Sequence, residues 1–224
     1  MQMKINREVL LKPLIKVAGI VERRHTLPIL SNLLLEAKNN TIKLTATDLE
    51  MQISLNVATE LKGAFSTTIS AKKFLDICRS LPEGANVKFS SSDGKAQVVS
   101  GRSRFTLATL PANEFPSVDN GENNIEFDID AAILKNLIDA TSFAMAQQDV
   151  RYYLNGMLWE VSANKLRAVA TDGHRMALCD AECSIEVSEL TKAILPRKGV
   201  IELSRLVADE GSVRVAMGSN HIRV

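Results

Sequence analysis

Residues 33–53 read LLLEAKNNTIKLTATDLEMQI, and residues 157–177 repeat their pattern as MLWEVSANKLRAVATDGHRMA. The two stretches align without a gap at an offset of 124 residues, with Glu at the fourth position and Ala-Thr-Asp at the fourteenth to sixteenth. Self-similarity of this kind indicates a repeated structural unit, and such a repeat determines the overall architecture of a chain more strongly than any local pattern. The repeat predicts that the chain folds into two similar units.

Three further blocks extend the repeat in the same order along the chain. One agrees through apolar positions at helical spacing, and the others through shared turn and helix patterns. The matched blocks, at offsets of 124, 125 and 127, are residues 3–18 with 127–142, 69–81 with 194–206, and 84–89 with 211–216. Four blocks in one order predict a duplication, with one domain over residues 1–120 and a second over residues 121–224.

The first unit runs on past the last residue that is matched in the second. Its sequence VVSGRSRFTLATLPANEFP ends at Pro116, whereas an offset of 127 pairs Gln97 with Val224. We therefore expect the second unit to be short of about 19 residues, the distance from Gln97 to Pro116, and the chain to be a fragment of a longer protein. The alternative is that the second unit naturally lacks its last strands, which would leave an open, unprotected sheet edge.

Local patterns predict two helices and several strands in each unit. Asn6, Ser70 and Asp130 are expected to cap three of the helices, and Pro196 is expected to open the fourth. The predicted helices cover residues 7–24, 71–81, 131–145 and 196–206. Short alternating runs such as TIKLTAT, NVKFSS, KLRAVAT and SVRVAM predict strands that are joined by tight turns. The fold class is therefore α+β with antiparallel sheets, and residues 111–124 form the linker.

The first predicted helix carries an apolar stripe and an internal proline. The stripe is expected to place five side chains on one side, facing the core: Val9, Leu10, Leu14, Val17 and Val21. Pro13 should kink this helix, because proline cannot donate a backbone hydrogen bond to the Val9 carbonyl.

The bulk composition is that of an ordinary globular protein. Of the 224 residues, 46% are hydrophobic and 24% are charged, which is ample for a buried core. No apolar run approaches the roughly 18 residues of a membrane span, and the N-terminus lacks the features of a signal peptide. Three cysteines, an odd number without a CxxC pattern, favour a reduced, cytoplasmic setting.

The net charge of +1 conceals an uneven distribution. The predicted helices carry most of the excess of Lys and Arg, and the strands and loops are acidic. This pattern suits one helical face turned towards a polyanion such as nucleic acid, bound through phosphates without reading of the bases. The alternative is that Lys and Arg simply serve as good helix formers on solvated faces.

No catalytic constellation stands out, so the chain is not expected to be an enzyme. The most suggestive site is ATDGHRM, in which Asp172 and His174 could act as an orienting group and a base. The first unit has Leu49 and Glu50 where the second has Gly173 and His174, and the shared Asp48 and Asp172 are better explained as turn formers. A hydrolase or ligand-binding α+β protein that uses Asp172 and His174 remains the rival hypothesis. Neither a metal site nor a cofactor is expected.

A second cluster, QQDVRYYLNG at residues 147–156, joins two tyrosines and an arginine ahead of a strand. Packing in the core or in a hairpin is one explanation. Exposed Tyr152 and Tyr153 beside Gln148 could instead contact a nucleic-acid backbone, since tyrosine hydroxyls and amides are common phosphate partners.

Several long motifs resemble those of one protein family. RRHTLPILSNLLLE, ATDLEM, SGRSRFTLATLPA, QDVRYYLNGMLWE, VATDGHRMA, PRKGVIEL and GSNHIR closely resemble the bacterial DNA polymerase III beta subunit, the replicative sliding clamp. The resemblance covers essentially the whole chain. It implies three similar domains per chain, of which the third is missing here, and two chains joined head to tail in a ring around duplex DNA. Helices line the hole, antiparallel sheets form the outside, and the ring is a non-catalytic processivity factor.

The resemblance also implies roles for individual residues. Residues matching those that approach DNA are Arg24, Gln148, Tyr152, Tyr153 and Lys198, with Arg79 and Arg197 as plausible additions. The wall of a pocket for short linear motifs of the polymerase alpha subunit, the clamp loader, other polymerases and repair factors matches Leu154, Thr171, Gly173, His174, Arg175 and Met176. The ring interface matches Lys73, Arg102, Arg104, Phe105 and Leu107.

Charge gives mild independent support for that interface. Residues 1–120 carry 16 cations and 11 acids, whereas residues 121–224 carry 11 cations and 15 acids. A basic first domain suits an acidic partner surface. Without a third domain no ring can close, so the fragment is expected to be monomeric, to bind partner peptides poorly, and to lie in the cytoplasm with no membrane contact.

Overall fold

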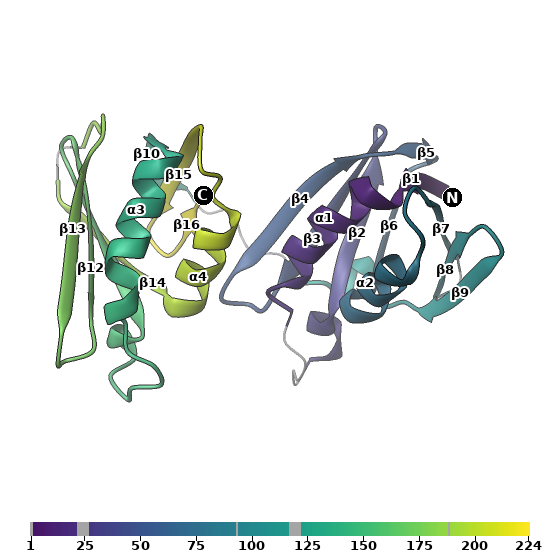
Figure 1. Cartoon of the computed structure of the whole chain (residues 1–224), viewed down its shortest axis with the longest axis horizontal. Coiled ribbons are helices and arrows are strands. Elements are labelled where there is room, and N and C mark those ends of the chain that lie inside the picture. Colours follow the sequence, from purple (N-terminus) through teal and green to yellow (C-terminus); the bar gives the residue numbers. More distant parts are fainter. Residues whose placement is uncertain (1, 22–26, 93, 117–121, 188) are drawn as a thin grey trace. The chain divides into compact units, whose positions relative to one another are not determined.

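The computed structural model describes residues 2–21, 27–92, 94–116, 122–187 and 189–224. The chain divides into two compact units, Met1–Val118 and Asp119–Val224. Each unit packs two α-helices on antiparallel sheets, which confirms the predicted α+β class (Figure 1).

The first unit holds two sheets. One has the strand order β5-β1-β7-β8-β9 and the other the order β4-β3-β2-β6. Helix α1 lies over β3 and β4, and α2 packs beside α1 over β2 and β6 (Figure 1). The elements are β1 (Gln2–Asn6), α1 (Arg7–Ala18), η1 (Pro28–Ser31), β2 (Asn32–Lys38), β3 (Thr41–Thr47), β4 (Gln52–Ala58), β5 (Glu60–Lys62), β6 (Phe65–Ser70), α2 (Ala71–Ser80), β7 (Asn86–Ser92), β8 (Lys95–Ser100), β9 (Ser103–Ala108) and η2 (Ala112–Glu114).

The second unit repeats this arrangement. Its sheets have the orders β13-β12-β11-β14 and β10-β15-β16, with α3 over β12 and β13 and α4 over β11 and β14. The elements are β10 (Asn123–Asp130), α3 (Ala131–Thr141), η3 (Ser142–Ala144), η4 (Tyr152–Leu154), β11 (Gly156–Ser162), β12 (Lys165–Thr171), β13 (Met176–Glu182), β14 (Thr191–Pro196), α4 (Arg197–Leu206), β15 (Ser212–Gly218) and β16 (Ile222–Arg223).

Strand register confirms the offset of 124 in the first half of each unit and corrects it in the second half. Ile5 lies opposite Val87, and its counterpart Ile129 lies opposite Val213, so the true offset of this block is 126 and not 127. Residues 65–80 and 191–206, which form β6 with α2 and β14 with α4, also match at 126 and not at 125. A shift of one residue would turn every side chain of a strand to the wrong face of the sheet. Packing of the sheet therefore fixes the register, which the few sequence identities do not determine.

The helix starts were predicted well and the helix ends less well. Asn6 accepts a hydrogen bond from the Glu8 N–H at 2.9 Å, and Asp130 accepts two from the first turn of α3, which confirms both caps. Ser70 occupies the N-cap position of α2 but its side chain makes no capping hydrogen bond, so that prediction was wrong. Pro196 is the N-cap residue of α4, which begins at Arg197.

Three helices end earlier than predicted. α1 ends at Ala18 beside Gly19, a residue of low helix propensity, and residues 22–24 of the predicted helix lie outside the described residues. α2 stops one residue early, at Ser80, where Leu81 turns to extended backbone. α3 ends at Thr141, whose hydroxyl donates to the Leu137 carbonyl at 2.7 Å, and residues 142–144 continue as a 3-10 turn.

The apolar stripe of α1 was predicted only in part. Leu10, Leu14 and Val17 are fully buried as expected, but Val9 is half exposed, and Val21 lies beyond the end of the helix and is half buried. Ile20, which also follows the helix, is fully buried although the stripe did not include it. Pro13 lies inside the helix, and the kink stays a prediction.

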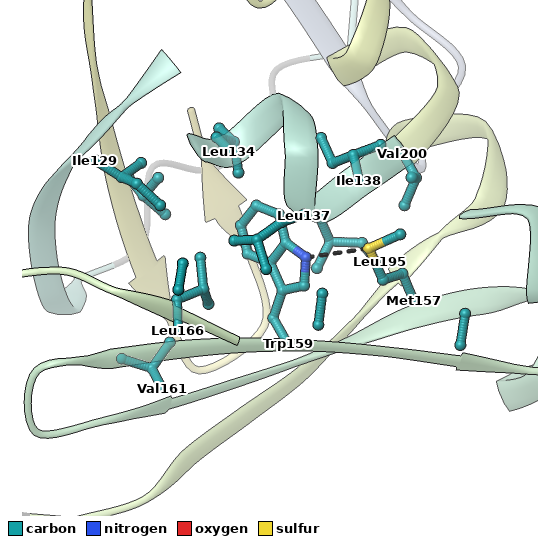
Figure 2. Close-up of a cluster of buried hydrophobic side chains, with 14 of the residues drawn as sticks. Ile129, Leu134, Leu137, Ile138, Met157, Trp159, Val161, Leu166, Leu195 and Val200 are labelled. Carbon is teal, nitrogen blue, oxygen red and sulfur yellow. Dashed lines mark hydrogen bonds between the residues drawn. The ribbon is translucent and has the colours of Figure 1, made fainter. Parts of the chain in front are cut away.

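The core of the second unit surrounds Trp159, the only tryptophan of the chain (Figure 2). Leu137 and Ile138 of α3, Val200 of α4 and Leu166 of β12 pack around it. The indole N–H donates to the Met157 sulfur at 3.4 Å. β11 is thereby held against both helices, and this strand follows directly on the loop that carries the predicted site residues.

Candidate functional site

The Ala-Thr-Asp repeat forms the same turn in both units. Asp172 Oδ1 accepts the backbone N–H groups of His174 and Arg175, each at 3.0 Å, and the Thr171 hydroxyl donates to the Arg175 carbonyl at 2.8 Å. In the first unit Asp48 accepts from Glu50 and Met51 in the same way. The prediction that both aspartates are turn formers is confirmed.

The hydrogen bonds of this turn engage Asp172 with its own loop. The backbone N–H groups of His174 and Arg175 lower the pKa of its carboxyl group, and the Arg175 side chain adds a hydrogen bond at 3.0 Å. Three of its roughly four acceptor positions are thus taken by the two backbone N–H groups and by Arg175, and none of these three bonds comes from the His174 ring that Asp172 would have to orient. The described residues also hold no group of three or more potential metal ligands.

The loop before β11 is closed by a set of hydrogen bonds. Asn155 Oδ1 accepts the Asp149 N–H at 2.9 Å, and its Nδ2 donates to the Asp149 carbonyl at 2.8 Å. The Asp149 carboxylate in turn accepts two parallel hydrogen bonds from the Arg151 guanidinium, each at 3.0 Å. This paired contact lowers the pKa of Asp149 to about 2.

The turn and the loop lie side by side. A Cβ atom placed on Gly173 would come within 3.1 Å of Arg151 Nη2, so the guanidinium rests against the glycine. Gly173 also has a φ of +87°, a conformation that glycine adopts without strain. The contribution of Asp149 and Arg151 was not predicted from the sequence, although their spacing in QQDVRYY was the available signal.

Residues of the predicted pocket wall differ widely in exposure. Leu154 is buried, Thr171 is half buried, and Gly173, His174, Arg175 and Met176 are exposed. Arg175 donates to the Phe143 carbonyl at 2.8 Å, and its guanidinium lies 5.6 Å from the centroid of the Phe143 ring. Phe143 therefore extends this surface, which the sequence did not predict.

The tyrosine pair is at the surface, so the explanation that both rings pack in the core is wrong. Tyr152 is 83% exposed and Tyr153 is 51% exposed, with the rings edge to face at a centroid distance of 5.9 Å. Gln148 is also exposed and has a φ of 56°. These three side chains present hydrogen-bonding groups to the solvent from one short loop.

The start of α4 is tied to this loop. The Arg197 N–H donates to the Asn155 carbonyl at 2.9 Å, and its guanidinium donates to the Met145 carbonyl at 3.1 Å. Lys198 follows on the first turn of α4 and is half buried. The structure thus brings Arg197 and Lys198 to the loop that carries Gln148, Tyr152 and Tyr153.

The predicted site residues of the first unit lie in two places. Lys73 and Arg79 are exposed on α2, and no ion pair joins them to a carboxylate of the described residues. Arg102 and Arg104 are exposed near and on β9, whereas Phe105 and Leu107 are half buried on the other face of that strand. β9 pairs only with β8 within the described part of the unit. Arg24 lies outside the described residues.

The chain matches two models of one protein family. Residues 1–119 match the family model of the DNA polymerase III beta subunit, N-terminal domain, and residues 128–224 match the model of its central domain. The beta sliding clamp of Pseudomonas putida is 52% identical over 225 residues, and that of Escherichia coli K12 is 49% identical. Both matches cover 100% of this chain and 61% of the relative, so the chain spans about three fifths of their length.

Solved structures agree with the sequence relatives. The crystal structure of the DNA polymerase III subunit beta from Pseudomonas aeruginosa matches with a TM-score of 0.95 at 50% identity, over 100% of this chain and 61% of that one. A DNA polymerase sliding clamp from Caulobacter crescentus matches with a TM-score of 0.89 at 39% identity, over 97% of this chain and 60% of that one.

Proposed function

This chain belongs to the DNA polymerase III beta subunit family, and from that premise we propose that it forms part of a sliding clamp, a non-catalytic processivity factor that encircles duplex DNA. Residues 1–120 would be clamp domain 1 and residues 121–224 clamp domain 2. The observation that carries the proposal is the duplicated unit with its basic helices, which two matching family models cover in order.

The helices supply the cations that DNA would meet. α2 carries Lys72, Lys73 and Arg79 against one acid, and α4 carries Arg197, Lys198 and Arg205 against one acid. The sheet of the second unit instead pairs its charges across strands, as in the contacts of Arg167 with Asp180 and Lys192 with Glu160. Arg205 is itself paired with Glu202, but each of the two helices keeps a net positive charge, and such a charge attracts phosphate at long range. We infer that the helical faces contact DNA, with Gln148, Tyr152 and Tyr153 adding hydrogen bonds to the backbone.

Two further surfaces would serve protein partners. We propose that Leu154, Thr171, Gly173, His174, Arg175 and Met176 form one wall of a pocket for short linear motifs of the polymerase alpha subunit, the clamp loader, other polymerases and repair factors. Phe105 and Leu107 of β9, with Lys73, Arg102 and Arg104 around them, would form the head-to-tail ring interface. The exposed strand edge and the surrounding cations support this second proposal.

The cellular setting follows from the same role. A clamp acts on DNA in the cytoplasm without a cofactor. None of the helices in the described part of the chain is long and apolar enough to cross a membrane. In this 224-residue form we expect a monomer, and static light scattering that reports a stable dimer would contradict this expectation.

Salt-dependent DNA binding tests the proposal directly. The chain should bind two duplexes of unrelated sequence equally, with a dissociation constant of about 10⁻⁴ to 10⁻⁶ M and a linear fall of log K with log salt. Replacing Arg79 by Ala should reduce the salt slope by about 1. Arg223→Ala is the matched control, because Arg223 is an exposed arginine on β16, outside the helices. Equal slopes for both variants, or a preference for one duplex, would refute the proposed DNA-facing surface.

A further inference from the structure

One sheet face of the first unit carries an excess of cations, although the strands and loops of the whole chain are acidic. In the β5-β1-β7-β8-β9 sheet, Met3 and Phe89 are buried, and the Phe89 ring lies 6.0 Å from the ring of Phe74 on α2. Alternate residues of each strand therefore point outward, away from the core. The charged residues of this outward face are one acid and five cations: Glu60, Lys4, Lys62, Lys88, Lys95 and Arg104.

Two of these lysines repel each other across neighbouring strands. Lys4 of β1 is directly opposite Lys88 of β7, and like charges in this position destabilise a sheet. Lys4 Nζ lies 3.5 Å from Glu60 Oε2 on its other side, but no ion pair joins Lys62 or Lys88 to a carboxylate of the described residues. Lys62 lies one cross-strand row away, opposite Gln2, and all three lysines are exposed. We call Lys4, Lys62 and Lys88 the lysine cluster.

The outward faces of the other three sheets all contain cross-strand ion pairs. These pairs have N–O distances of 2.6–3.8 Å and join Lys43 to Glu36, Arg214 to Asp128, Arg167 to Asp180 and Lys192 to Glu160. A positive charge that the fold itself does not balance attracts anions from solution. A repulsive pair that brings no structural gain is also typical of a functional surface. We therefore looked for the kind of anion that this face would fit.

The side chains around the lysines indicate the chemistry of that anion. Gln2, Ser90 and Gln97 form the next cross-strand row beside Lys62, and no described residue of this face is aromatic. Lysine, glutamine and serine side chains are common partners of DNA phosphates. A single strand would need aromatic rings for stacking, and an acidic peptide is held best by bidentate arginine and by apolar anchors. The residue types favour the sugar–phosphate backbone of a duplex.

The lysine cluster lies on the other side of the sheet from α2. Phe74 of α2 packs against the inward side of the sheet through Phe89, and Arg79 is exposed about 140° further around the helix at 3.6 residues per turn. A duplex at Arg79 would be separated from the lysine cluster by α2 itself, the apolar core and the sheet. One duplex segment therefore cannot contact both surfaces along the same side of the unit.

We propose that the lysine cluster binds the phosphate backbone of a second DNA duplex, separate from the duplex at the helical faces. Lys62 and Lys88 would contact phosphates directly, and Lys4 would be shared between a phosphate and Glu60. Binding would not depend on the base sequence. It needs neither a closed ring nor the proposed ring interface, because Arg104 lies on β9, at the far edge of the sheet from Lys62. The proposal goes beyond the proposed function, since the first unit would hold DNA on two opposite surfaces.

An NMR titration of the 224-residue chain with a short duplex tests this proposal. The duplex has about 10 base pairs, one helical turn, and the lysine side-chain signals of the chain are followed. Saturable shifts are expected for Lys4, Lys62 and Lys88, in addition to those of Lys72 on α2. Non-specific DNA binding has dissociation constants of about 10⁻⁴ to 10⁻⁶ M, so the absence of shifts in the lysine cluster at about 1 mM duplex would overturn the proposal.

Two matched variants separate a binding site from a general effect of charge. Lys88→Gln and Lys43→Gln each remove one positive charge from an outward sheet face of the first unit, and Lys43 is already paired with Glu36 at 3.8 Å. Lys88→Gln should reduce the salt slope of binding, measured from the Lys62 signal, by about 1. It should not lower the midpoint of thermal unfolding, because it removes the repulsion from Lys4. Lys43→Gln should leave the slope unchanged, and equal losses for both variants would overturn the proposal.

Two further measurements distinguish this proposal from the proposed function and from a protein partner. In Arg79→Ala the shift of Lys72 should weaken while those of Lys62 and Lys88 persist. Shifts confined to Lys72 would overturn the second DNA site and leave the helical DNA surface intact, whereas shifts confined to the lysine cluster would do the reverse. Tighter binding of a polyglutamate peptide than of the duplex at Lys62 and Lys88 would overturn the assignment to DNA and indicate an acidic protein segment instead.

Discussion

Replacing Leu166 by Ala tests the claim that the inner and outer faces of the second unit's sheet differ in kind. Leu166 is fully buried in the cluster around Trp159 (Figure 2). The substitution removes the equivalent of three methylene groups at about 0.8 kcal/mol each, or about 2.4 kcal/mol of transfer free energy. The cavity that remains adds to this, so the free energy of unfolding should fall by about 3–5 kcal/mol.

The matched control is Leu178→Ala on the adjacent strand. Leu178 lies on the outward face of β13, opposite Val169, and its side chain is 48% exposed. The same chemical change should therefore lower the free energy of unfolding by less than about 1 kcal/mol. The two variants make the same chemical change on opposite faces of neighbouring strands, β12 and β13.

The single tryptophan makes the measurement specific to this unit. Urea unfolding followed by Trp159 fluorescence should give a lower midpoint for Leu166→Ala with an unchanged slope. In thermal unfolding, about 4 °C per kcal/mol for a unit of this size predicts a loss of more than about 10 °C. A loss below about 1 kcal/mol for Leu166→Ala, or equal losses for the two variants, would refute the assignment of faces.

Three further predictions concern single contacts. Met157→Leu keeps the side-chain volume but leaves the buried indole N–H of Trp159 without its acceptor, so it should lower the free energy of unfolding by about 1–3 kcal/mol in the same urea assay. Hydrogen bonds from Arg151 lower the pKa of Asp149 to about 2, so this contact stabilises the fold at neutral pH and is lost as the pH falls from about 4 towards 2. Asp149→Asn should therefore flatten the pH dependence of the free energy of unfolding between about pH 4 and pH 2, and an unchanged profile would contradict the contact. Leu49 is exposed and has a φ of 78°, a backbone conformation that is strained for leucine. Leu49→Gly should relieve about 1 kcal/mol of this strain and raise the midpoint of thermal unfolding. A lower midpoint would show that the leucine side chain contributes more to stability than the strain costs.

The helix caps show why part of the fold was predictable. Asn6 and Asp130 act on N–H groups two or three residues away, so the interaction is encoded within a few letters of sequence. The Asp48 and Asp172 turns are local in the same sense, and the repeat presented this turn twice, once in each unit. Local hydrogen bonds of this kind form wherever the short sequence occurs, which is why these predictions were confirmed.

The candidate site was predictable only as a set of residues. The sequence singled out Tyr152 and Gly173, but the contact of Arg151 with Gly173 joins the loop before β11 to the turn between β12 and β13. The roles in DNA and partner binding came from the resemblance and stay predictions. Exposure was also undecided, because the same tyrosine pattern suited a buried hairpin equally well.

By itself the sequence determined that one α+β unit occurs twice, because an ungapped match and local capping and turn signals need no knowledge of distant contacts. Only the tertiary structure decided the register of the later strands, with Ile5 opposite Val87 and Ile129 opposite Val213, and the exposure of Val9 and burial of Ile20. It also decided which face of each sheet is covered. The physical reason is that register and burial are fixed by packing between segments far apart in the chain, where a shift of one residue or a rotation of one helix changes the contacts while the sequence pattern stays the same.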